Sequence, residues 1–367
     1  MTKAINIGNQ RQLFLDNIFF DQVDGVDLKM HNPELKEVSI KADRPWETGG
    51  IHYSCVLEDN GKFRMWYRSD EGDALLGRTG GSNERIAGTC YAESYDGVQW
   101  EKPDLGLVEH SGSKANNIVL PTGEIHGINA SVILDPNSVP DERYKMILRR
   151  KKPKDDAVEG YVSHDGFHWR SIETNPYLKE GPFDSHNTVI RDDETEKYAI
   201  YLRGIGNSKK GQFKGGHRAI RRSESTDFRT WSEPKIVFEA DEEDPDDIHF
   251  YTNAAIKYPR ASRAFLMFPM ILYTERKYPG APFQGLSDVQ MATSRNGIKW
   301  ERFHRIPFIS PGLDEKNWVD RNPIMGLGII QTSDTELSMY YSTRFRSTGN
   351  PIRRCTIRTD GFVSAHA

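Results

Sequence analysis

The sequence of 367 residues contains 49 Lys or Arg and 53 Asp or Glu, which gives a formal net charge of −4. This balance argues against a nucleic-acid-binding protein, which usually carries a basic excess. There is no apolar run of membrane-spanning length and no signal-peptide core near Met1, so we expect a cytoplasmic protein without a membrane partner, or an exported one if a leader has been removed. Cys55, Cys90 and Cys355 are too few for a disulfide framework and are expected to be buried thiols within strands.

The first apolar run of the chain, Gln12-Leu13-Phe14-Leu15, has the length of a single strand. After it, one order of elements recurs along the chain. A short apolar run, such as Ser131-Val132-Ile133-Leu134, leads into turn residues and then into a second run rich in aromatic residues. This order predicts two strands joined by a hairpin. The second runs are 62–67, 143–148, 197–202, 263–268 and 337–341.

A seven-residue phrase follows each pair of runs. It reads Ser94-Tyr95-Asp96-Gly97-Val98-Gln99-Trp100 in its first copy and returns at residues 163–169, 225–231 and 294–300, with a degenerate fifth copy at 358–363. The Asp-Gly pair is a hairpin signal, because glycine accepts the positive φ that such turns need. The tryptophan of each copy is expected to pack between neighbouring units. Copies that begin at residues 94, 163, 225 and 294 indicate one supersecondary unit repeated along the chain.

Each unit therefore contains four antiparallel strands, and five such units predict an all-β fold, the five-bladed β-propeller. The last unit lacks a fourth strand, and we expect the N-terminal run 12–15 to supply it and to close the ring, which also hides the sheet edges. A β-sandwich with chance turns is the alternative, and the near-constant spacing disfavours it. We expect one domain over 1–367, with a lead-in at 1–30 and blades at about 45–105, 125–175, 185–235, 250–305 and 320–363.

The alternation of strand direction predicts which loops share a face. The start of the first strand, the end of the second and the start of the third lie together, opposite the Asp-Gly hairpins. Long and dissimilar loops on this face mark it as the binding face. The polar residues expected to converge there are Glu47, His52, Arg68, Glu124, His126, Arg149, Asp184, His186, Asn187, Arg203, Asp246, Asp247, His249, Asn253, Asp288, Asp320, Arg321, Asn322 and Arg344.

A group of carboxylates around a polar funnel suits the cleavage of a glycosidic bond, which needs one acid to protonate the leaving oxygen and a second carboxylate to activate water or attack the sugar. For each acid taken alone, a structural ion pair with a neighbouring arginine is an equally good interpretation.

Several segments resemble a large group of bacterial glycosyl-hydrolase-like proteins: Arg11–Asp16, Phe63–Tyr67, Trp100–Gly106, Tyr251–Tyr258 and Ser287–Gln290. The resemblance spans nearly the whole chain and implies a five-bladed propeller related in fold to glycoside hydrolase families 32 and 43. The catalytic motifs of those two families are absent from the corresponding places, so their catalytic roles do not transfer residue by residue.

The leading hypothesis is a glycoside hydrolase that acts on an oligosaccharide or glycoside and needs no cofactor. Glu47 is expected to be the proton donor, because the adjacent Trp46 would desolvate it. Asp184 would be the base or nucleophile and Asp247 the modulator. Residues expected to bind the substrate are Asp320, Asp288, Arg203, Arg321, His186, His52, Arg68 and Asn187.

Two other classes remain open. His52, His126, His186 and His249 fall near four inner strands, where they could hold a divalent metal in a carbohydrate-active hydrolase or lyase, although no tight ligand spacing is present. A carbohydrate-binding propeller without activity is the other class. An anionic sugar is a further possibility, because several loops of the binding face are basic, at Lys209, Lys210, Lys214, His217, Arg218, Arg344, Arg346 and Arg353.

Overall fold

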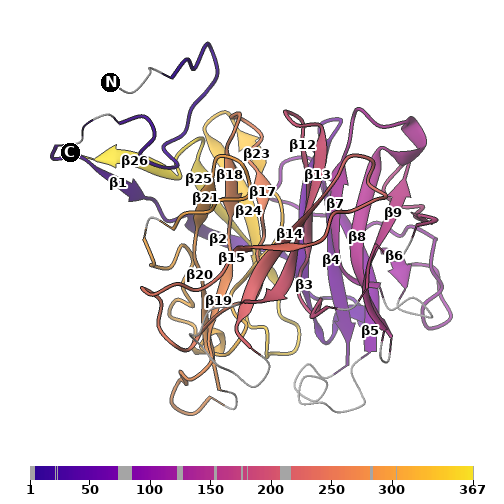
Figure 1. The fold of residues 1–367 in the computed structure, drawn as a ribbon. Coiled ribbons are helices and arrows are strands. Elements are labelled where there is room, and N and C mark those ends of the chain that lie inside the picture. Colours follow the sequence, from indigo (N-terminus) through magenta and orange to yellow (C-terminus); the bar gives the residue numbers. More distant parts are fainter. Residues whose placement is uncertain are drawn as a thin grey trace.

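The structure is a computed structural model. It describes residues 5–20, 22, 24–72, 85–121, 127–152, 155–174, 177–179, 181–206, 216–281, 284–302 and 304–366. These residues form antiparallel sheets, with three single-turn 3-10 helices at Pro45–Glu47 (η1), Pro140–Glu142 (η2) and Glu315–Asn317 (η3). The predicted all-β class is confirmed, and the arrangement is propeller-like (Figure 1). No helix among the described residues is long and apolar enough to cross a membrane.

The first three sheets follow the chain in order. The first contains β3 (Gly50–Asp59), β4 (Lys62–Glu71), β5 (Arg85–Ser94) and β6 (Ile118–Pro121). The second contains β7 (Gly127–Leu134), β8 (Tyr144–Lys152), β9 (Asp155–Ser163), β10 (Arg170–Ser171) and β11 (Leu178–Lys179). The third contains β12 (Thr188–Asp192), β13 (Lys197–Ile205), β14 (Arg218–Ser225) and β15 (Lys235–Phe238).

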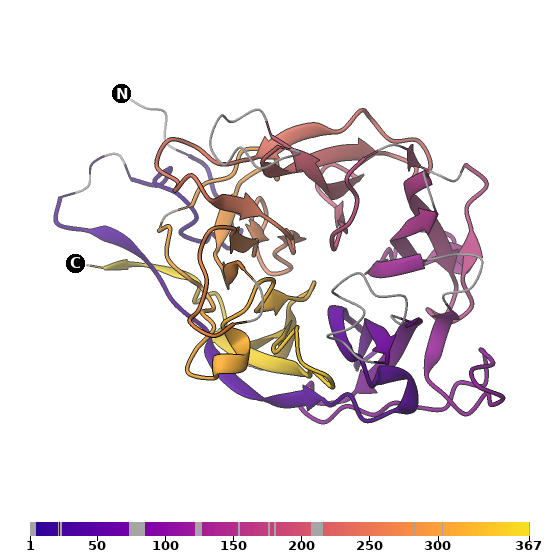
Figure 2. The same ribbon diagram turned by 90° about the horizontal axis from the view of Figure 1, so that it is seen from below.

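The fourth unit is divided between two small sheets. One joins β16 (Ile248–Phe250), β19 (Met270–Tyr273) and β20 (Leu286–Val289), and the other joins β17 (Ile256–Lys257), β18 (Phe265–Met267) and β21 (Ala292–Ser294). The last unit contains β22 (Ile324–Met325), β23 (Ile330–Ser333), β24 (Glu336–Ser342) and β25 (Ile352–Arg358). Figure 2 shows the sheets following one another in chain order around a common centre.

The outer strand of the last sheet comes from the N-terminal part of the chain. It is β2 (Glu34–Ile40), which pairs with β25. The prediction that residues 12–15 supply this strand is therefore wrong. Leu13 and Leu15 are buried in the core instead, and the hydroxyl of Thr293 donates to the Leu15 carbonyl. Nearby, β1 (Asp27–Met30) pairs with β26 (Val363–His366).

The repeated phrase forms the same turn in its four copies. In the first copy, Oδ1 of Asp96 accepts the N–H groups of Val98 and Gln99, both at 2.8 Å, and Asp165, Asp227 and Asn296 repeat this pattern. Gly97, Gly166 and Gly297 have positive φ at the turn, as the Asp-Gly signal predicts.

These hairpins also connect neighbouring sheets. Trp66 of β4 donates to the Gly166 carbonyl, Tyr201 of β13 to that of Gly297, and Tyr340 of β24 to that of Gly97. The indoles of Trp100 and Trp300 pack against Tyr340 and Tyr201. The predicted structural role of these two tryptophans between units is confirmed. Cys55, Cys90 and Cys355 are buried free thiols within strands, also as predicted.

Candidate functional site

Three residues near the inner strands adopt the left-handed conformation, which costs about 1 to 2 kcal/mol for a residue with a Cβ. They are Tyr53 (φ 54°), Asn129 (φ 59°) and Arg321 (φ 59°). The register of β3 shifts between His52 and Cys55, and that of β7 between Ile128 and Ser131. Such irregularities redirect side chains and often occur beside functional sites. The left-handed residues and the register shifts therefore mark this region as a candidate functional site.

Asp184 is the accessible carboxylate of this region. It directly precedes the third sheet, and its side chain is 64% exposed. Nη1 of Arg149, from β8 of the second sheet, lies 2.6 Å from Oδ1 of Asp184. The carboxylate is therefore oriented by a charged hydrogen bond from a neighbouring unit while it still faces solvent.

Tyr251, which follows β16, is surrounded by three arginines. The guanidinium carbons of Arg203, Arg218 and Arg321 lie 4.3, 5.3 and 6.0 Å from the centre of its ring. Burial opposes ionisation of the hydroxyl, but the charges of Arg203 and Arg321 outweigh it and lower the pKa of Tyr251 below its usual value of 10. Tyr251 was not among the predicted site residues.

Tyr53 completes what we call the central cluster, defined as Tyr53, Asp184, Arg203, Arg218, Tyr251 and Arg321. Burial raises the pKa of Tyr53, and the charges of Tyr251 and Asp184 raise it further. The ring of Tyr53 packs against those of His52 at 4.7 Å and His186 at 5.4 Å. The two tyrosines thus differ in acidity, because the arginines surround only one of them closely.

Two ion pairs hold the arginines beside this cluster. Arg346 donates to both oxygens of Asp320 at 2.8 and 2.7 Å, and Arg321 donates to Oδ2 at 2.8 Å. Burial disfavours the Asp320 carboxylate, yet Arg346 and Arg321 lower its pKa below the usual range. This acid therefore serves as a fixed anion for two arginines.

The second ion pair lies in the first sheet. Arg68 donates to both oxygens of Asp70 at 2.7 and 3.2 Å, and His52 lies 3.5 Å from the same carboxylate. Arg68 also reaches Oδ1 of Asn129, whose amide donates to the Ser185 carbonyl. This chain of contacts links three sheets, and Asp70 was not among the predicted residues.

The predicted residues Asn187 and His186 support the backbone. The amide of Asn187 accepts the N–H of Arg203 at 3.1 Å and donates to the Phe183 carbonyl at 3.0 Å. Nε2 of His186 lies 3.2 Å from the Ala130 carbonyl, and burial lowers the pKa of this imidazole to about 4. A neutral His186 can pack against Tyr53 without adding another positive charge to the cluster.

Glu47 lies apart from the central cluster. It is fully buried in η1, where it accepts Nζ of Lys102 at 2.5 Å, the hydroxyl of Tyr67 at 2.7 Å and the N–H groups of Asp43 and Arg44 at 3.2 Å. This placement gives no support to the predicted role of proton donor, because Lys102, Tyr67 and two backbone N–H groups already engage both oxygens of Glu47. The acid instead ties η1 to the first sheet.

Asp247 and Asp288 form a separate acidic pair. Arg276 lies 3.4 Å from Asp247 and stacks over the ring of Tyr273 at 3.7 Å, and the Tyr273 hydroxyl donates to Asp288 at 3.2 Å. Arg276 and Tyr273 thus connect the two acids to one another within the fourth unit. The predicted convergence of Asp247 with Asp184 stays a prediction.

Asp288 is expected to make stability depend on pH. Burial raises its pKa from 3.8 to about 6, although Tyr273 and Arg276 oppose the shift. The folded protein therefore binds this proton more tightly than the unfolded chain, and stability is lost as pH rises from about 4 through about 6. At pH 7 the free energy of unfolding of Asp288→Asn should exceed that of the wild type by up to about 3 kcal/mol. At pH 3.5 the two free energies should be nearly equal. Urea unfolding of both proteins at the two pH values measures this difference in stability. The same difference at pH 7 and at pH 3.5 would contradict the raised pKa of Asp288.

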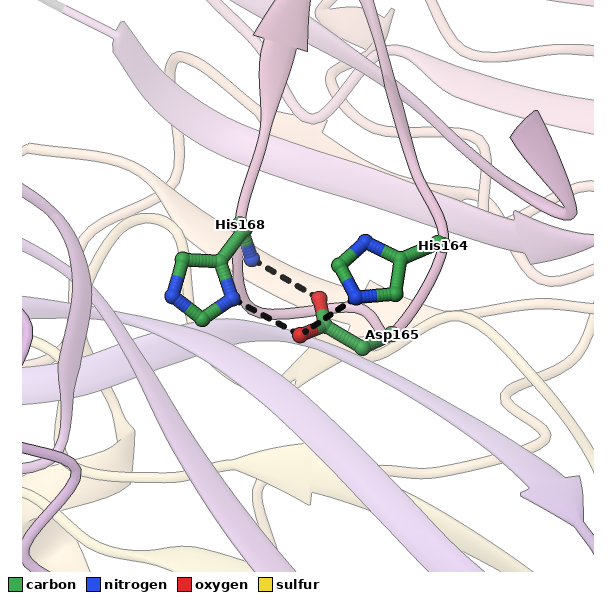
Figure 3. A group of neighbouring side chains, drawn as sticks. All are labelled: His164, Asp165 and His168. Carbon is green, nitrogen blue, oxygen red and sulfur yellow. Dashed lines mark hydrogen bonds and ion pairs between the residues drawn. The ribbon is translucent and has the colours of Figure 1, made fainter. Parts of the chain in front are cut away.

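Among the described residues, the predicted metal ligands His52, His186 and His249 belong to no group with the geometry of a metal site. His52 contacts Asp70, and His249 accepts the N–H of Arg218, while His126 lies outside the described residues. Among the described residues, one group of three side chains has the geometry of a metal site, and it lies on the second-sheet hairpin (Figure 3). It consists of His164, Asp165 and His168.

The geometry of this hairpin cluster would allow it to hold a divalent metal ion such as Zn²⁺. The turn uses Oδ1 of Asp165, while Oδ2 lies 2.7 Å from Nδ1 of His168 and 3.4 Å from Nε2 of His164 (Figure 3). Ligand atoms around tetrahedral zinc lie about 3.3 Å apart, so small side-chain movements would suffice. His164→Tyr with His168→Gln copies the residues of the first hairpin, Tyr95 and Gln99, and should weaken zinc binding by at least about tenfold in calorimetry. Unchanged affinity in this double variant would contradict the site.

Comparisons with known proteins come from sequence and from structure. No protein-family model matches the chain. Two Mycobacterium tuberculosis proteins, Uncharacterized protein MT1551 (strain CDC 1551 / Oshkosh) and Uncharacterized protein Rv1502 (strain ATCC 25618 / H37Rv), are each 41% identical over 156 residues. The match covers 41% of this chain and 46% of each relative, so it spans about half of their length.

Solved structures match over most of the chain. A structure titled "Glycoside hydrolase" has a TM-score of 0.60 at 15% identity and covers 89% of this chain and 92% of its own. An N-acetylgalactosamine deacetylase from F. plautii, in complex with blood group B trisaccharide, has a TM-score of 0.59 at 13% identity, with coverages of 90% and 95%. Beta-1,2-mannobiose phosphorylase from Listeria innocua has a TM-score of 0.60 at 12% identity, with coverages of 91% and 97%. At these identities the likeness shows the fold, and the chain therefore has a glycoside-hydrolase-like fold.

Proposed function

We propose that this protein is a carbohydrate-active enzyme that cleaves a glycosidic bond at the central cluster. We interpret the sheets as five blades of a propeller that β2 closes, with the cluster over its centre. The observation that carries the proposal is Asp184, an exposed carboxylate oriented by Arg149 among tyrosines and arginines from other sheets. The fold neighbours that act on carbohydrates support the substrate class.

Asp184 is the proposed base or nucleophile. Its exposure leaves room for a sugar ring or a water molecule, and Arg149 fixes its direction. A glycosidic bond also requires a proton donor for the leaving oxygen. We assign this role to Tyr251, because the guanidinium carbons of Arg203 and Arg321 lie 4.3 and 6.0 Å from the centre of its ring, and their charges lower the pKa of its hydroxyl toward the range in which proton transfer is efficient. Burial within the cluster would keep bulk water away from that proton.

The remaining residues position the substrate. Arg203 and Arg321 face Tyr251, and each guanidinium offers several donors to sugar hydroxyls. Asp320 and Arg346 fix Arg321, while Asp70 fixes Arg68. Ion pairs of this kind hold the binding groups in place before the substrate arrives, which lowers the cost of orienting it.

A substrate screen tests the proposal. The full-length protein is incubated with aryl glycosides and with a pool of neutral and acidic oligosaccharides, with and without inorganic phosphate, and the products are read by mass spectrometry. We expect at least one glycoside to be cleaved, and the mass of the product separates hydrolysis from phosphorolysis. Binding of oligosaccharides with no cleavage of any of them would contradict the enzymatic proposal and favour a carbohydrate-binding protein.

A further inference from the structure

Two arginines of the central cluster have no carboxylate partner among the described residues. Arg203 is 6% exposed, its Nη2 donates to the Tyr251 carbonyl at 3.4 Å, and its Nε is buried without a hydrogen-bond acceptor in the described part of the chain. Nη1 of Arg218 lies 3.1 Å from Nδ1 of His249. Other buried arginines among the described residues, such as Arg346 and Arg354, form ion pairs.

The positive charges of Arg203 and Arg218 also repel one another. Burial lowers the pKa of Arg218, and the charge of Arg203 lowers it further, because both guanidiniums approach the same tyrosine ring. The charge of Asp184 offsets part of this repulsion, but that carboxylate lies 2.6 Å from Arg149. Like charges held together in a partly desolvated place are costly, and an anion that bound between them would relieve the cost.

We propose that Arg203 and Arg218 bind an oxyanion that takes part in the reaction, either the carboxylate of an acidic sugar or inorganic phosphate. The guanidinium group suits both ligands, because its planar set of donors matches two oxygens at once. Bound there, the anion lies against Tyr251 and within the same cluster as Asp184. This inference rests on the proposed function and adds the chemical class of the ligand to it.

Calorimetry on the full-length protein tests the inference. Sodium glucuronate, sodium galacturonate and inorganic phosphate are titrated in separate experiments at constant ionic strength, with glucose as the neutral control. We expect saturable binding of a uronate or of phosphate and none of glucose. Arg203→Gln and Arg218→Gln should each weaken that binding about ten- to a hundredfold, as expected for the loss of charged hydrogen bonds. Arg170→Gln, at an arginine that is 60% exposed beside Glu142, should leave it unchanged.

The outcomes separate the two possible ligands and the two proposals. Binding of uronates alone assigns an acidic sugar, and binding of phosphate alone assigns phosphate. If Arg203→Gln fails to fold, Arg203→Lys keeps the charge, removes the planar donor set and should still weaken binding about tenfold. The anion site is overturned if none of these anions binds, or if both glutamine variants bind as wild type does. Cleavage of a neutral glycoside together with no anion binding would overturn this inference and leave the proposed function standing.

Discussion

Replacing Asp184 by Asn is expected to lower the turnover of a confirmed glycoside substrate by about a thousandfold or more, as the loss of a catalytic base or nucleophile usually does. The side chain is 64% exposed, so the variant should fold normally and change the free energy of unfolding by less than about 1 kcal/mol. Turnover and urea unfolding are measured on the same preparation. The combination of lost activity and retained stability is the expected result.

Asp193→Asn is the matched control for that experiment. Asp193 is also an exposed carboxylate paired with an arginine, since its side chain is 69% exposed and contacts Arg191. It lies in the turn between β12 and β13, and its replacement should leave turnover unchanged. Full activity of Asp184→Asn on the same substrate would remove Asp184 from the catalytic site and with it the proposed mechanism.

Lys102→Met is expected to destabilise the protein by about 3 to 5 kcal/mol, which is the usual cost of breaking a buried ion pair. The change would leave Glu47, fully buried, without its cation, and would also remove donors to Asp43 and to the Lys41 carbonyl. The midpoint of urea unfolding at pH 7 measures the loss. Adding Glu47→Gln to this variant should restore part of the stability, because the unpaired charge then disappears.

Lys62→Met provides the comparison for Lys102. Lys62 pairs with Glu93 at 2.9 Å, but both side chains are more than 20% exposed. An ion pair near solvent contributes about 1 kcal/mol or less, so this variant should unfold close to wild type. Similar losses in the two variants would contradict the structural role that the geometry gives to Glu47.

The repeated elements could be predicted from the sequence because each is specified locally. The Asp-Gly turns depend on residues within one phrase, as the contacts of Asp96 with Val98 and Gln99 show. The aromatic runs similarly predict β4, β8, β13 and β24. The exception is the outer strand of the last sheet, since the apolar residues Leu13 and Leu15 pack in the core and β2, with its shifts in register, pairs with β25.

The site could be predicted only in part, because its chemistry depends on distant contacts. Asp184, Arg203 and Arg321, which were expected to lie on one face, all act electrostatically on Tyr251. Tyr251 carries no local signal, and its altered acidity comes from arginines of other segments. The engagement of Glu47 could not be predicted, because its partner, Lys102, lies 55 residues further along the chain.

The pairing of β2 with β25 has a consequence for biosynthesis. The ribosome releases residues 34–40 long before residues 352–358, so the final sheet cannot acquire its outer strand until β25 has also emerged. During that interval the backbone N–H and C=O groups of β2 lack the partners that β25 later provides. An unpaired strand of this kind favours pairing between nascent chains. Contacts that join such distant segments also slow folding, and completion of this sheet is expected to be a late event after translation.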